Sequence, residues 1–206
     1  MTITIRKLLA AAAIAISLPA TSAMAEITVY ATTGYLGDAV SKIAPDAEVI
    51  TMVGPGGDPH TYQPSTRDIQ TIQSADAVVW NGLFLEARME DLLMSLGDKA
   101  LATAERLPSA MLLPWEDDLN DPHVWNSPVA WSAIVGFVAD HLAKIDPDNA
   151  DTYVANAKAY IQDIRAADAQ ATALLSAIPA ENRILITGHD AFEYCGDIYG
   201  VEGPAT

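Results

Sequence analysis

The first half of the chain alternates between short apolar segments and longer amphipathic segments, and this alternation restricts the fold more than any other feature. Four short segments rich in β-forming residues predict strands, at residues 27–31, 48–53, 75–80 and 99–104. Three segments with a helical spacing of apolar residues predict helices, at residues 35–43, 65–74 and 84–96. Such alternation is typical of a parallel sheet with helices on its faces, in which ligands bind beyond the carboxyl ends of the strands.

Two longer helical segments follow. Ser127 and Pro128 suit the N-cap and the first position of a helix that runs to about Ile145. The segment 148–178 contains no Gly or Pro and repeats apolar residues at helical spacing, so we expect one helix there. At about 1.5 Å per residue it would be roughly 45 Å long, which is more than one compact lobe needs. We therefore interpret it as a connection between two lobes.

The sequence begins a second α/β unit but contains little of it. Segment 183–187 predicts a strand, and the residues from there to Thr206 are enough for one more short helix. A lone strand and helix cannot close a core of their own. Either this piece packs on the first lobe or the sequence is a truncated form of a longer protein, and we favour truncation. We predict an α/β fold of two parallel-sheet lobes joined by one long rigid helix, with the second lobe incomplete in this chain.

Composition and charge exclude several classes of protein. Half of the 206 residues are hydrophobic, which is enough for a packed core and argues against disorder. The net charge of -16 opposes binding to nucleic acid or to an anionic membrane surface, because both need clustered Lys and Arg. The negative charge suits the attraction of cations, although acidic composition is also a common means of keeping a protein soluble.

The N-terminus has the features of an export signal. Arg6 and Lys7 precede an apolar run from Leu8 to Leu18 that is too short to span a bilayer. Residues 23–25 (Ala-Met-Ala) form a small-x-small cleavage site, so we expect a signal peptide over residues 1–25 and a mature chain that starts at Glu26.

The single cysteine, Cys195, lies far from this cleavage site and cannot carry the lipid of a lipoprotein. One cysteine also allows no internal disulfide, and a small core residue is the simplest interpretation of it. We predict a free periplasmic protein that is not lipid-anchored.

The chain has four histidines, and two of them lie in the same tripeptide. Asp-Pro-His occurs at residues 58–60 and again at residues 121–123, and His189 follows the apolar run of the last predicted strand. Either tripeptide alone is more easily explained as a turn, but two copies and a histidine at a strand end favour a metal site. His60, His123 and His189 are therefore our candidate ligands.

The neighbours of these histidines suit the same interpretation. Asp58, Asp121 and Asp190 are available to accept the second ring N–H of an imidazole ligand, although local sequence does not show that they reach it. The histidines lie 63 and 66 residues apart, which excludes a compact zinc-finger spacing. A zinc hydrolase stays open, because three histidines with a free position can be catalytic, yet the sequence offers no clear general base.

Other conspicuous residues have ordinary structural explanations. We interpret His141 as a solvent-facing residue of the helix that begins at Pro128, and not as a ligand. Trp125 and Trp131 are expected to be packing residues. The glycines at 54, 56 and 57 lack the Gly-Lys-Ser/Thr of a phosphate loop, so we expect a turn there.

Five stretches together resemble the zinc/manganese solute-binding receptors of ABC transporters (cluster A-I). They are TTGYLGD at 32–38, MVGPGGDPHTY at 52–62, AVVWNGLFLE at 77–86, DPHVW at 121–125 and TGHDAF at 187–192. The likeness covers nearly all of the mature chain. It implies two α/β lobes joined by a long helix, one metal ion between the lobes, and delivery of that ion to a membrane permease without chemistry.

The resemblance also assigns ligands. His60 and His123 match the two ligands of the N-terminal lobe, and His189 matches the first ligand of the C-terminal lobe. Histidine at the third position favours zinc on ligand softness, although relatives with this pattern also handle manganese. The chain lacks the His-rich loop that is frequent in zinc-specific members. The cargo is therefore Zn²⁺ or Mn²⁺.

The main departure from the family is at the end of the chain. The family's fourth ligand, an Asp or Glu, is expected beyond residue 206, so we expect weak metal capture by the 206-residue form. We divide the chain into a signal peptide (1–25), an N-terminal α/β metal-binding lobe (26–147), a linking helix (148–178) and the start of a C-terminal lobe (179–206). We expect a monomer with an ABC permease as partner. The rival functions are an exported zinc hydrolase and an adhesion module that carries a structural ion.

Overall fold

The structure is a computed structural model that describes residues 27–115 and 118–203. Its first lobe is built on a four-stranded sheet in the order β2-β1-β3-β4, and every neighbouring pair is parallel. The strands are short: β1 (Thr28–Ala31), β2 (Glu48–Thr51), β3 (Ala77–Trp80) and β4 (Ala100–Ala102). The predicted α/β class with a parallel sheet is confirmed. The predicted signal peptide lies outside the described residues.

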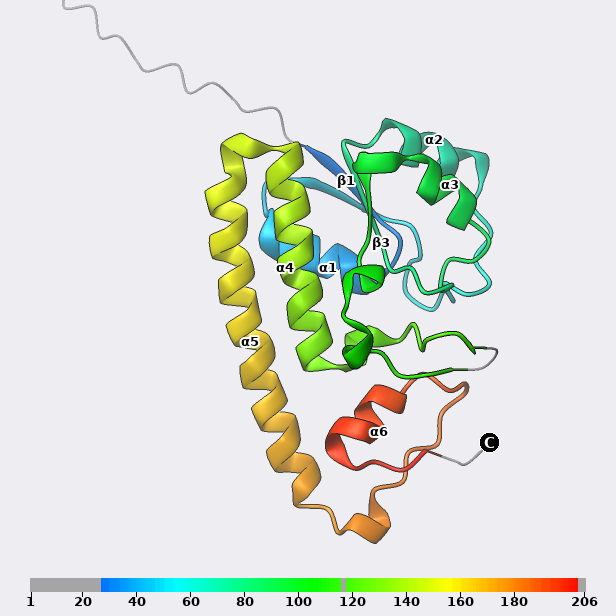
Figure 1. Ribbon diagram of the computed structural model, residues 1–206, viewed down its shortest axis with the longest axis vertical. Coiled ribbons are helices and arrows are strands. Elements are labelled where there is room, and N and C mark those ends of the chain that lie inside the picture. The colour runs from blue at the N-terminus through cyan, green and yellow to red at the C-terminus, as the bar shows by residue number, and fades with distance from the viewer. Residues whose placement is uncertain (1–26, 116–117, 204–206) are drawn as a thin grey trace, which may run out of the picture.

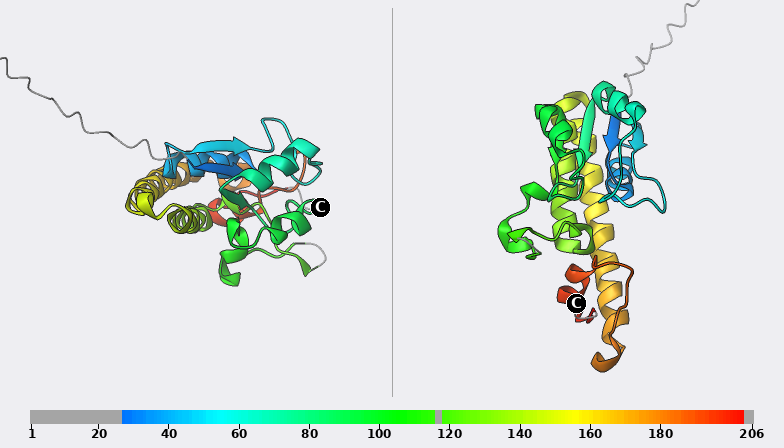
Figure 2. Two further views of the ribbon diagram at one scale, coloured as in Figure 1. Left: turned by 90° about the horizontal axis from the view of Figure 1, so that it is seen from above. Right: turned by 90° about the vertical axis from the view of Figure 1, so that its right-hand side faces the viewer.

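Helices cover both faces of this sheet (Figures 1 and 2). Because successive side chains of a strand point to opposite faces, Val29 and Ala31 pack on one side while Tyr30 packs on the other. The larger core lies against α1 (Gly34–Ile43) and α4 (Pro128–Ile145), which contribute buried aliphatic residues such as Leu36 and Ile134. Both faces of the strands are therefore buried, which explains their almost continuous apolar sequences.

The second face carries two shorter helices, α2 (Thr66–Ser74) and α3 (Glu90–Ser95). Ile72 and Leu93 are fully buried there against Tyr30, Val78 and Trp80 of the sheet. This smaller core completes a three-layer arrangement of helices, sheet and helices.

The sequence-predicted helix starts are confirmed by their caps. The Ser65 hydroxyl accepts a hydrogen bond from the Asp68 N–H, and the Asp68 carboxylate accepts one from the Ser65 N–H, which is a capping box at the start of α2. At α4 the Ser127 hydroxyl accepts from the Ala130 N–H and Pro128 occupies the first turn. Each cap satisfies backbone donors that a helix start otherwise leaves unpaired.

The helix predicted over residues 84–96 is wrong in its first half. Only α3, which starts at Glu90, is helical, and the residues from 83 to 89 form turns. The reason is Glu86, whose carboxylate accepts hydrogen bonds from the backbone N–H groups of Asn81 and Gly82. A side chain that turns back onto the preceding backbone in this way competes with helix formation.

The long helix is present as α5 (Ala150–Ser176), slightly shorter than predicted. It runs antiparallel to α4 and continues past the first lobe to the C-terminal segment (Figure 1). Its 27 residues give a length of about 40 Å. Its buried residues, Tyr153 and Ala157, lie in the first half, so the first half packs on the lobe and the second half extends beyond it.

The strand predicted at 183–187 does not form. The structure has a single parallel bridge there, between Ile184 and Glu202, because no neighbouring strand extends the pairing in the described residues. The C-terminal segment instead contains a short helix, α6 (Glu193–Tyr199), that packs on the first lobe. The Tyr194 side chain is buried in the larger core, and its hydroxyl contacts both Leu113 and Asp121.

Among the described residues, none of the helices combines the length and apolar character needed to cross a membrane.

Candidate metal centre

The three candidate histidines, far apart in sequence, meet at one place. His60 lies in the loop after β2, His123 lies just before α4, and His189 lies in the segment that leads to α6. One ring nitrogen from each lies within 4.8 Å of the others. His60 and His123 are the closest pair, with 3.1 Å between their Nε2 atoms. This place is beyond the carboxyl ends of the parallel strands, where α/β folds bind ligands.

His123 is the most firmly held of the three. It is buried, and its Nδ1 lies 2.6 Å from Oδ1 of Asp121, which is buried as well. A carboxylate at Nδ1 selects the tautomer with the proton on that nitrogen, so the lone pair of Nε2 points into the site. The other carboxylate oxygen of Asp121 is buried and has no hydrogen-bond partner among the described residues. A buried carboxylate oxygen left without a partner favours a cation nearby.

His60 is held by its backbone. Asp58 Oδ1 accepts a hydrogen bond from the His60 N–H at 2.9 Å, and Asp58 Oδ2 accepts one from the Thr61 hydroxyl at 2.9 Å. Slight desolvation opposes ionisation of Asp58, but these hydrogen bonds outweigh it and lower the pKa of the carboxyl. Within the described residues, no hydrogen bond joins Asp58 to the His60 ring.

The electrostatic surroundings favour a neutral imidazole at His60. Partial burial is the main cause that lowers the pKa of His60, and His123 adds to this effect, whereas Asp58 acts in the opposite direction. A neutral imidazole is the form that binds a metal ion, so this ligand needs to lose no proton near neutral pH.

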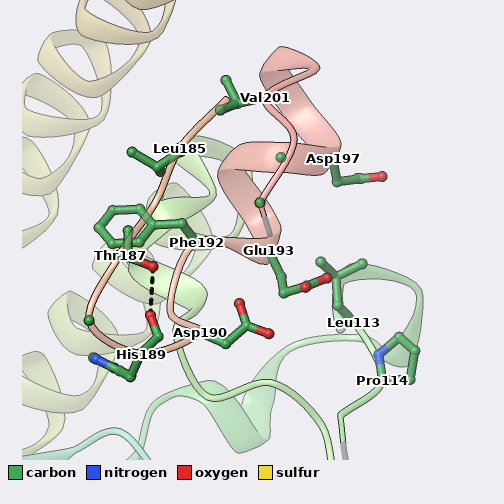
Figure 3. Close-up of a pocket in the computed structure, with 13 residues that line it drawn as sticks. Leu113, Pro114, Leu185, Thr187, His189, Asp190, Phe192, Glu193, Asp197 and Val201 are labelled. Carbon is green, nitrogen blue, oxygen red and sulfur yellow. Dashed lines mark hydrogen bonds between the residues drawn. The ribbon is translucent and has the colours of Figure 1, made fainter. Parts of the chain in front are cut away.

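His189 is the exposed member of the cluster. Its backbone carbonyl accepts a hydrogen bond from the Thr187 hydroxyl at 2.8 Å, which shapes the loop (Figure 3). Together with Asp190 and Glu193, His189 also lines a cavity of about 550 Å³. Asp190 raises the pKa of Glu193 through its charge, so this carboxylate interacts with another acid. Of the three aspartates considered from the sequence, only Asp121 hydrogen-bonds to a candidate ligand ring within the described residues.

Aromatic rings lie beside two of the candidate ligands, His60 and His123. Trp115 lies with its ring centroid 4.9 Å from that of His123 and 6.1 Å from that of His60. Trp125 packs edge-on against His123 and stacks on Tyr35 at 4.6 Å. Trp125, predicted as a packing residue, is one, although it also lines the groove of about 1060 Å³ that contains the histidines.

The remaining sequence predictions have mixed outcomes. His141 lies outside the cluster, but its predicted exposure is wrong, because it is only 8% exposed and its Nε2 donates to the Lys99 carbonyl at 3.2 Å. Most residues of the helix that bears it are apolar, so the sequence pattern gave little guide to which side of the helix faces solvent. Trp131 is buried in the core, as predicted.

Cys195 is half-buried, and burial raises the pKa of its thiol, which disfavours the thiolate that metals require. The glycine-rich segment forms a turn closed by a hydrogen bond from the Gly57 N–H to the Gly54 carbonyl, and Gly56 has a positive φ of 80°. The predicted turn is confirmed, whereas Cys195 is only half-buried and is not among the described core residues.

Sequence reasoning missed the buried residues that hold the loop carrying His123, either directly or through one another. Asn81 and Glu86 are buried at the end of β3, and Tyr194 donates to the Asp121 carbonyl at 3.0 Å. A carboxylate inside the apolar run Leu83-Phe84-Leu85-Glu86 is the one signal that pointed to a buried polar contact there.

The arrangement suits one transition-metal ion. Two ligands of a tetrahedral ion with Zn–N bonds of about 2.0–2.1 Å lie about 3.3 Å apart, close to the 3.1 Å between Nε2 of His60 and Nε2 of His123. Three imidazoles form a borderline-soft donor set that suits zinc and neighbouring ions. A four-coordinate ion held by three histidines keeps one position for a further ligand.

Comparisons with known proteins agree with this chemistry. A model of the family described as "ZnuA: Zinc-uptake complex component A periplasmic" matches residues 29–206. The chain is 38% identical over 183 residues to the manganese-binding lipoprotein MntA of Bacillus subtilis. This match covers 87% of the present chain and 60% of MntA. It is 36% identical over 196 residues to the iron-binding protein YfeA of Yersinia pestis, covering 94% and 63% of the two chains.

A solved structure shows the same fold. The periplasmic zinc-binding protein TroA of Treponema pallidum superposes with a TM-score of 0.83 at 35% identity, covering 86% of this chain and 65% of that chain. The chain thus spans about 60% of the length of the curated relatives it matches.

Proposed function

The chain belongs to the family of periplasmic zinc-uptake component A proteins, and from this premise we propose that it is a receptor for a divalent transition metal. It captures the ion as cargo and delivers it to an ABC permease for import. The relatives are named for binding manganese, zinc and iron, and three imidazoles suit such ions. Between the two ions considered from the sequence, three histidine ligands favour Zn²⁺ over Mn²⁺, which prefers more oxygen ligands.

One observation carries the proposal. Ring nitrogens from three distant parts of the chain lie within 4.8 Å of one another, and the most buried ring is oriented by a carboxylate. A buried histidine that serves only packing needs no second and third histidine beside it. His60, His123 and His189 are the proposed ligands, and an Asp or Glu is the proposed fourth.

The domain plan and the location belong to the same proposal. Residues 26–147 form the N-terminal lobe, 148–178 the linking helix and 179–206 the start of the C-terminal lobe. We propose export through the signal at residues 1–25 and a mature protein free in the periplasm as a monomer. MntA is named a lipoprotein, whereas here the only cysteine is Cys195.

A metal titration tests the receptor function. The chain stripped with chelator is titrated with zinc and with manganese against a chromophoric competitor, and tryptophan fluorescence follows the site because Trp115 and Trp125 flank it. We expect one equivalent of zinc to bind per chain, with loss of binding in His60→Ala and His123→Ala. His141→Gln is the matched control, because it removes a histidine outside the cluster. Binding that survives both ligand substitutions would overturn the proposal.

A second assay separates the receptor from the zinc hydrolase. The zinc-loaded chain is incubated with ester and phosphate substrates, and a receptor should show no turnover that depends on His60. It should also release its zinc unchanged to a stronger chelator. Turnover lost in His60→Ala would favour the enzyme. Partner binding that persists after chelation would favour the adhesion module.

A further inference from the structure

We propose that Asn81 is a positioning residue for the metal ligand His123, and that Glu86 is the buried anchor that holds Asn81 in place. This inference rests on the proposed metal capture and identifies the residues that preorganise it. Neither residue is among the candidate ligands. Both are nearly inaccessible to solvent, and they lie where β3 ends at the edge of the sheet that faces the site.

Asn81 acts on the peptide bond that precedes His123. Its Nδ2 donates to the Pro122 carbonyl at 3.0 Å, while the N–H of the same peptide unit donates to Asp121 Oδ1 at 2.9 Å. Both polar groups of the Pro122–His123 peptide are therefore held, one by Asn81 and one by Asp121. With the backbone held in this way and Asp121 at the ring, little freedom is left in the direction of Nε2.

The first Asp-Pro-His copy lacks the equivalent support. Asp58 accepts from the His60 N–H as Asp121 does from His123, but no hydrogen bond in the described part of the chain reaches the Pro59 carbonyl. The Asn81 contact is thus a feature of one copy of the tripeptide and not of the turn itself. It distinguishes the buried ligand from the half-buried one.

Glu86 holds Asn81 in turn. Its Oε1 accepts from the Thr32 hydroxyl at 2.6 Å and from the Asn81 N–H at 2.9 Å, and its Oε2 accepts from the Gly82 N–H at 3.1 Å. These bonds tie the ends of β1 and β3 together at the edge of the sheet. Three donors to one buried carboxyl group make a satisfied network, which fixes geometry better than isolated contacts do.

The backbone between Asn81 and Glu86 is strained to allow these contacts. Leu83 and Phe84 have positive φ values of 53° and 63°. Residues other than glycine rarely adopt this left-handed backbone conformation. Such strain persists only where surrounding contacts enforce it, and it concentrates at functional sites. Here the enforcing contacts include Glu86 and Glu105, whose Oε1 accepts from the Leu83 N–H at 2.9 Å.

The test compares Asn81→Ala with a control that removes a different buried hydrogen bond at the end of the same strand. Thr103→Val is that control. The Thr103 hydroxyl donates to the Trp80 carbonyl at 3.0 Å without touching the 121–123 loop, and this carbonyl still accepts from the Thr103 N–H at 2.8 Å in the variant. Zinc affinity is measured by competition and thermal unfolding by circular dichroism. We expect Asn81→Ala to weaken zinc binding roughly tenfold, as loss of a residue that supports a metal ligand does, and Thr103→Val to change it less than about twofold.

A spectroscopic measurement separates positioning from general stability. Cobalt(II) bound at the site should show altered visible absorption in Asn81→Ala and an unaltered spectrum in Thr103→Val, because only the first variant frees the peptide that precedes His123. Unchanged affinity and spectrum in a folded Asn81→Ala chain would overturn the inference. Zinc binding that is absent from the unmodified chain would instead overturn the proposed function.

Two further measurements apply if Asn81→Ala does not fold. Glu86→Gln keeps the side-chain volume, but one of its terminal atoms becomes an NH2 group that cannot accept, and we expect it to weaken zinc binding severalfold. In the unmodified chain, the side-chain amide signals of Asn81 should shift on zinc binding and exchange slowly with solvent. Full zinc affinity in Glu86→Gln, or Asn81 amide protons that exchange rapidly, would contradict the inference.

Discussion

The two copies of Asp-Pro-His form the same turn but hold their histidines in different ways. In each copy the aspartate Oδ1 accepts from the histidine N–H at 2.9 Å. Asp121 also reaches the ring of His123 at 2.6 Å, whereas the second oxygen of Asp58 accepts from the Thr61 hydroxyl. The second copy is buried and the first is exposed or half-buried.

This difference shows that the tripeptide determines only the local turn. What the aspartate does for the ring depends on burial and on the neighbours that the fold supplies, which for the second copy are Asn81 and Tyr194. We infer that His123 is the fixed ligand of the site, while His60 can adjust to an arriving ion. Substitutions made in both copies can test this contrast.

Removing the histidine of either tripeptide should weaken zinc binding, and the loss of affinity should be larger for the second copy. His123→Ala removes the preoriented nitrogen, and we expect zinc affinity to fall on the order of a hundredfold or more, since even residues that only support a ligand contribute about 10–100-fold. His60→Ala should also weaken binding strongly, but less than His123→Ala. Competition titrations of both variants decide this. A larger loss in His60→Ala would reverse the assigned order.

The two aspartates should differ more clearly than the two histidines. Asp121→Asn keeps an acceptor for the turn but removes the negative charge beside the His123 ring. We expect a loss of zinc affinity of roughly tenfold to a hundredfold, with unfolding still cooperative. Isothermal titration measures the affinity. An Asp121→Asn chain with unchanged affinity would show that the buried carboxylate has no role at the metal.

Asp58→Asn is the matched change in the first copy, and it should have a small effect. The asparagine oxygen can still accept from the His60 N–H, and no contact with the His60 ring is lost in the described structure. We expect zinc affinity to change by less than about threefold. An effect equal to that of Asp121→Asn, measured in the same titration, would remove the distinction between the two copies.

His141 is a histidine outside the repeated tripeptide. We expect its substitution to change the free energy of unfolding but not zinc affinity. Burial is the main cause that lowers the pKa of His141 below its usual 6.5, while the bond to the Lys99 carbonyl acts in the opposite direction. The unfolded chain then takes up a proton first as pH falls below about 6.5, so stability is full above that pH and declines through the lowered folded-state pKa.

The matched variant is His141→Gln, which can keep a donor toward the Lys99 carbonyl but does not titrate. Relative to it, the unmodified chain should lose unfolding free energy as pH falls below about 6.5, as measured by urea denaturation. Parallel pH dependence in the two chains would contradict the account of His141.

Much of the fold could be predicted from the sequence because its signals are local. Ser65 and Ser127 mark helix starts through caps that involve residues three positions away. The almost continuous apolar sequences of the strands indicate a sheet that is buried on both faces. The predictions failed where a distant partner decided the outcome. Residues 84–89 are not helical because the Glu86 carboxylate accepts from the Asn81 backbone N–H. Residues 183–187 form no strand because Glu202 is their one pairing partner in the described part of the chain.

The candidate ligands could be proposed from sequence because histidine is rare in this chain and its context is repeated. Their support could not be proposed in the same way. Nothing in the local sequence tells that Asp121 reaches a ring while Asp58 does not, or that Asn81 contacts Pro122 across 41 positions. These contacts depend on how the strand ends and the loops meet in three dimensions.

X-ray absorption at the zinc edge tests the central claim most directly. The chain loaded with one equivalent of zinc should show nitrogen ligands at about 2.0–2.1 Å, with the scattering pattern of three imidazoles and no sulfur at about 2.3 Å. The imidazole count should fall to two in His189→Ala and should stay at three in His141→Gln. A sulfur ligand, or an imidazole count unchanged in His123→Ala, would contradict the assignment of His60, His123 and His189 as one metal site.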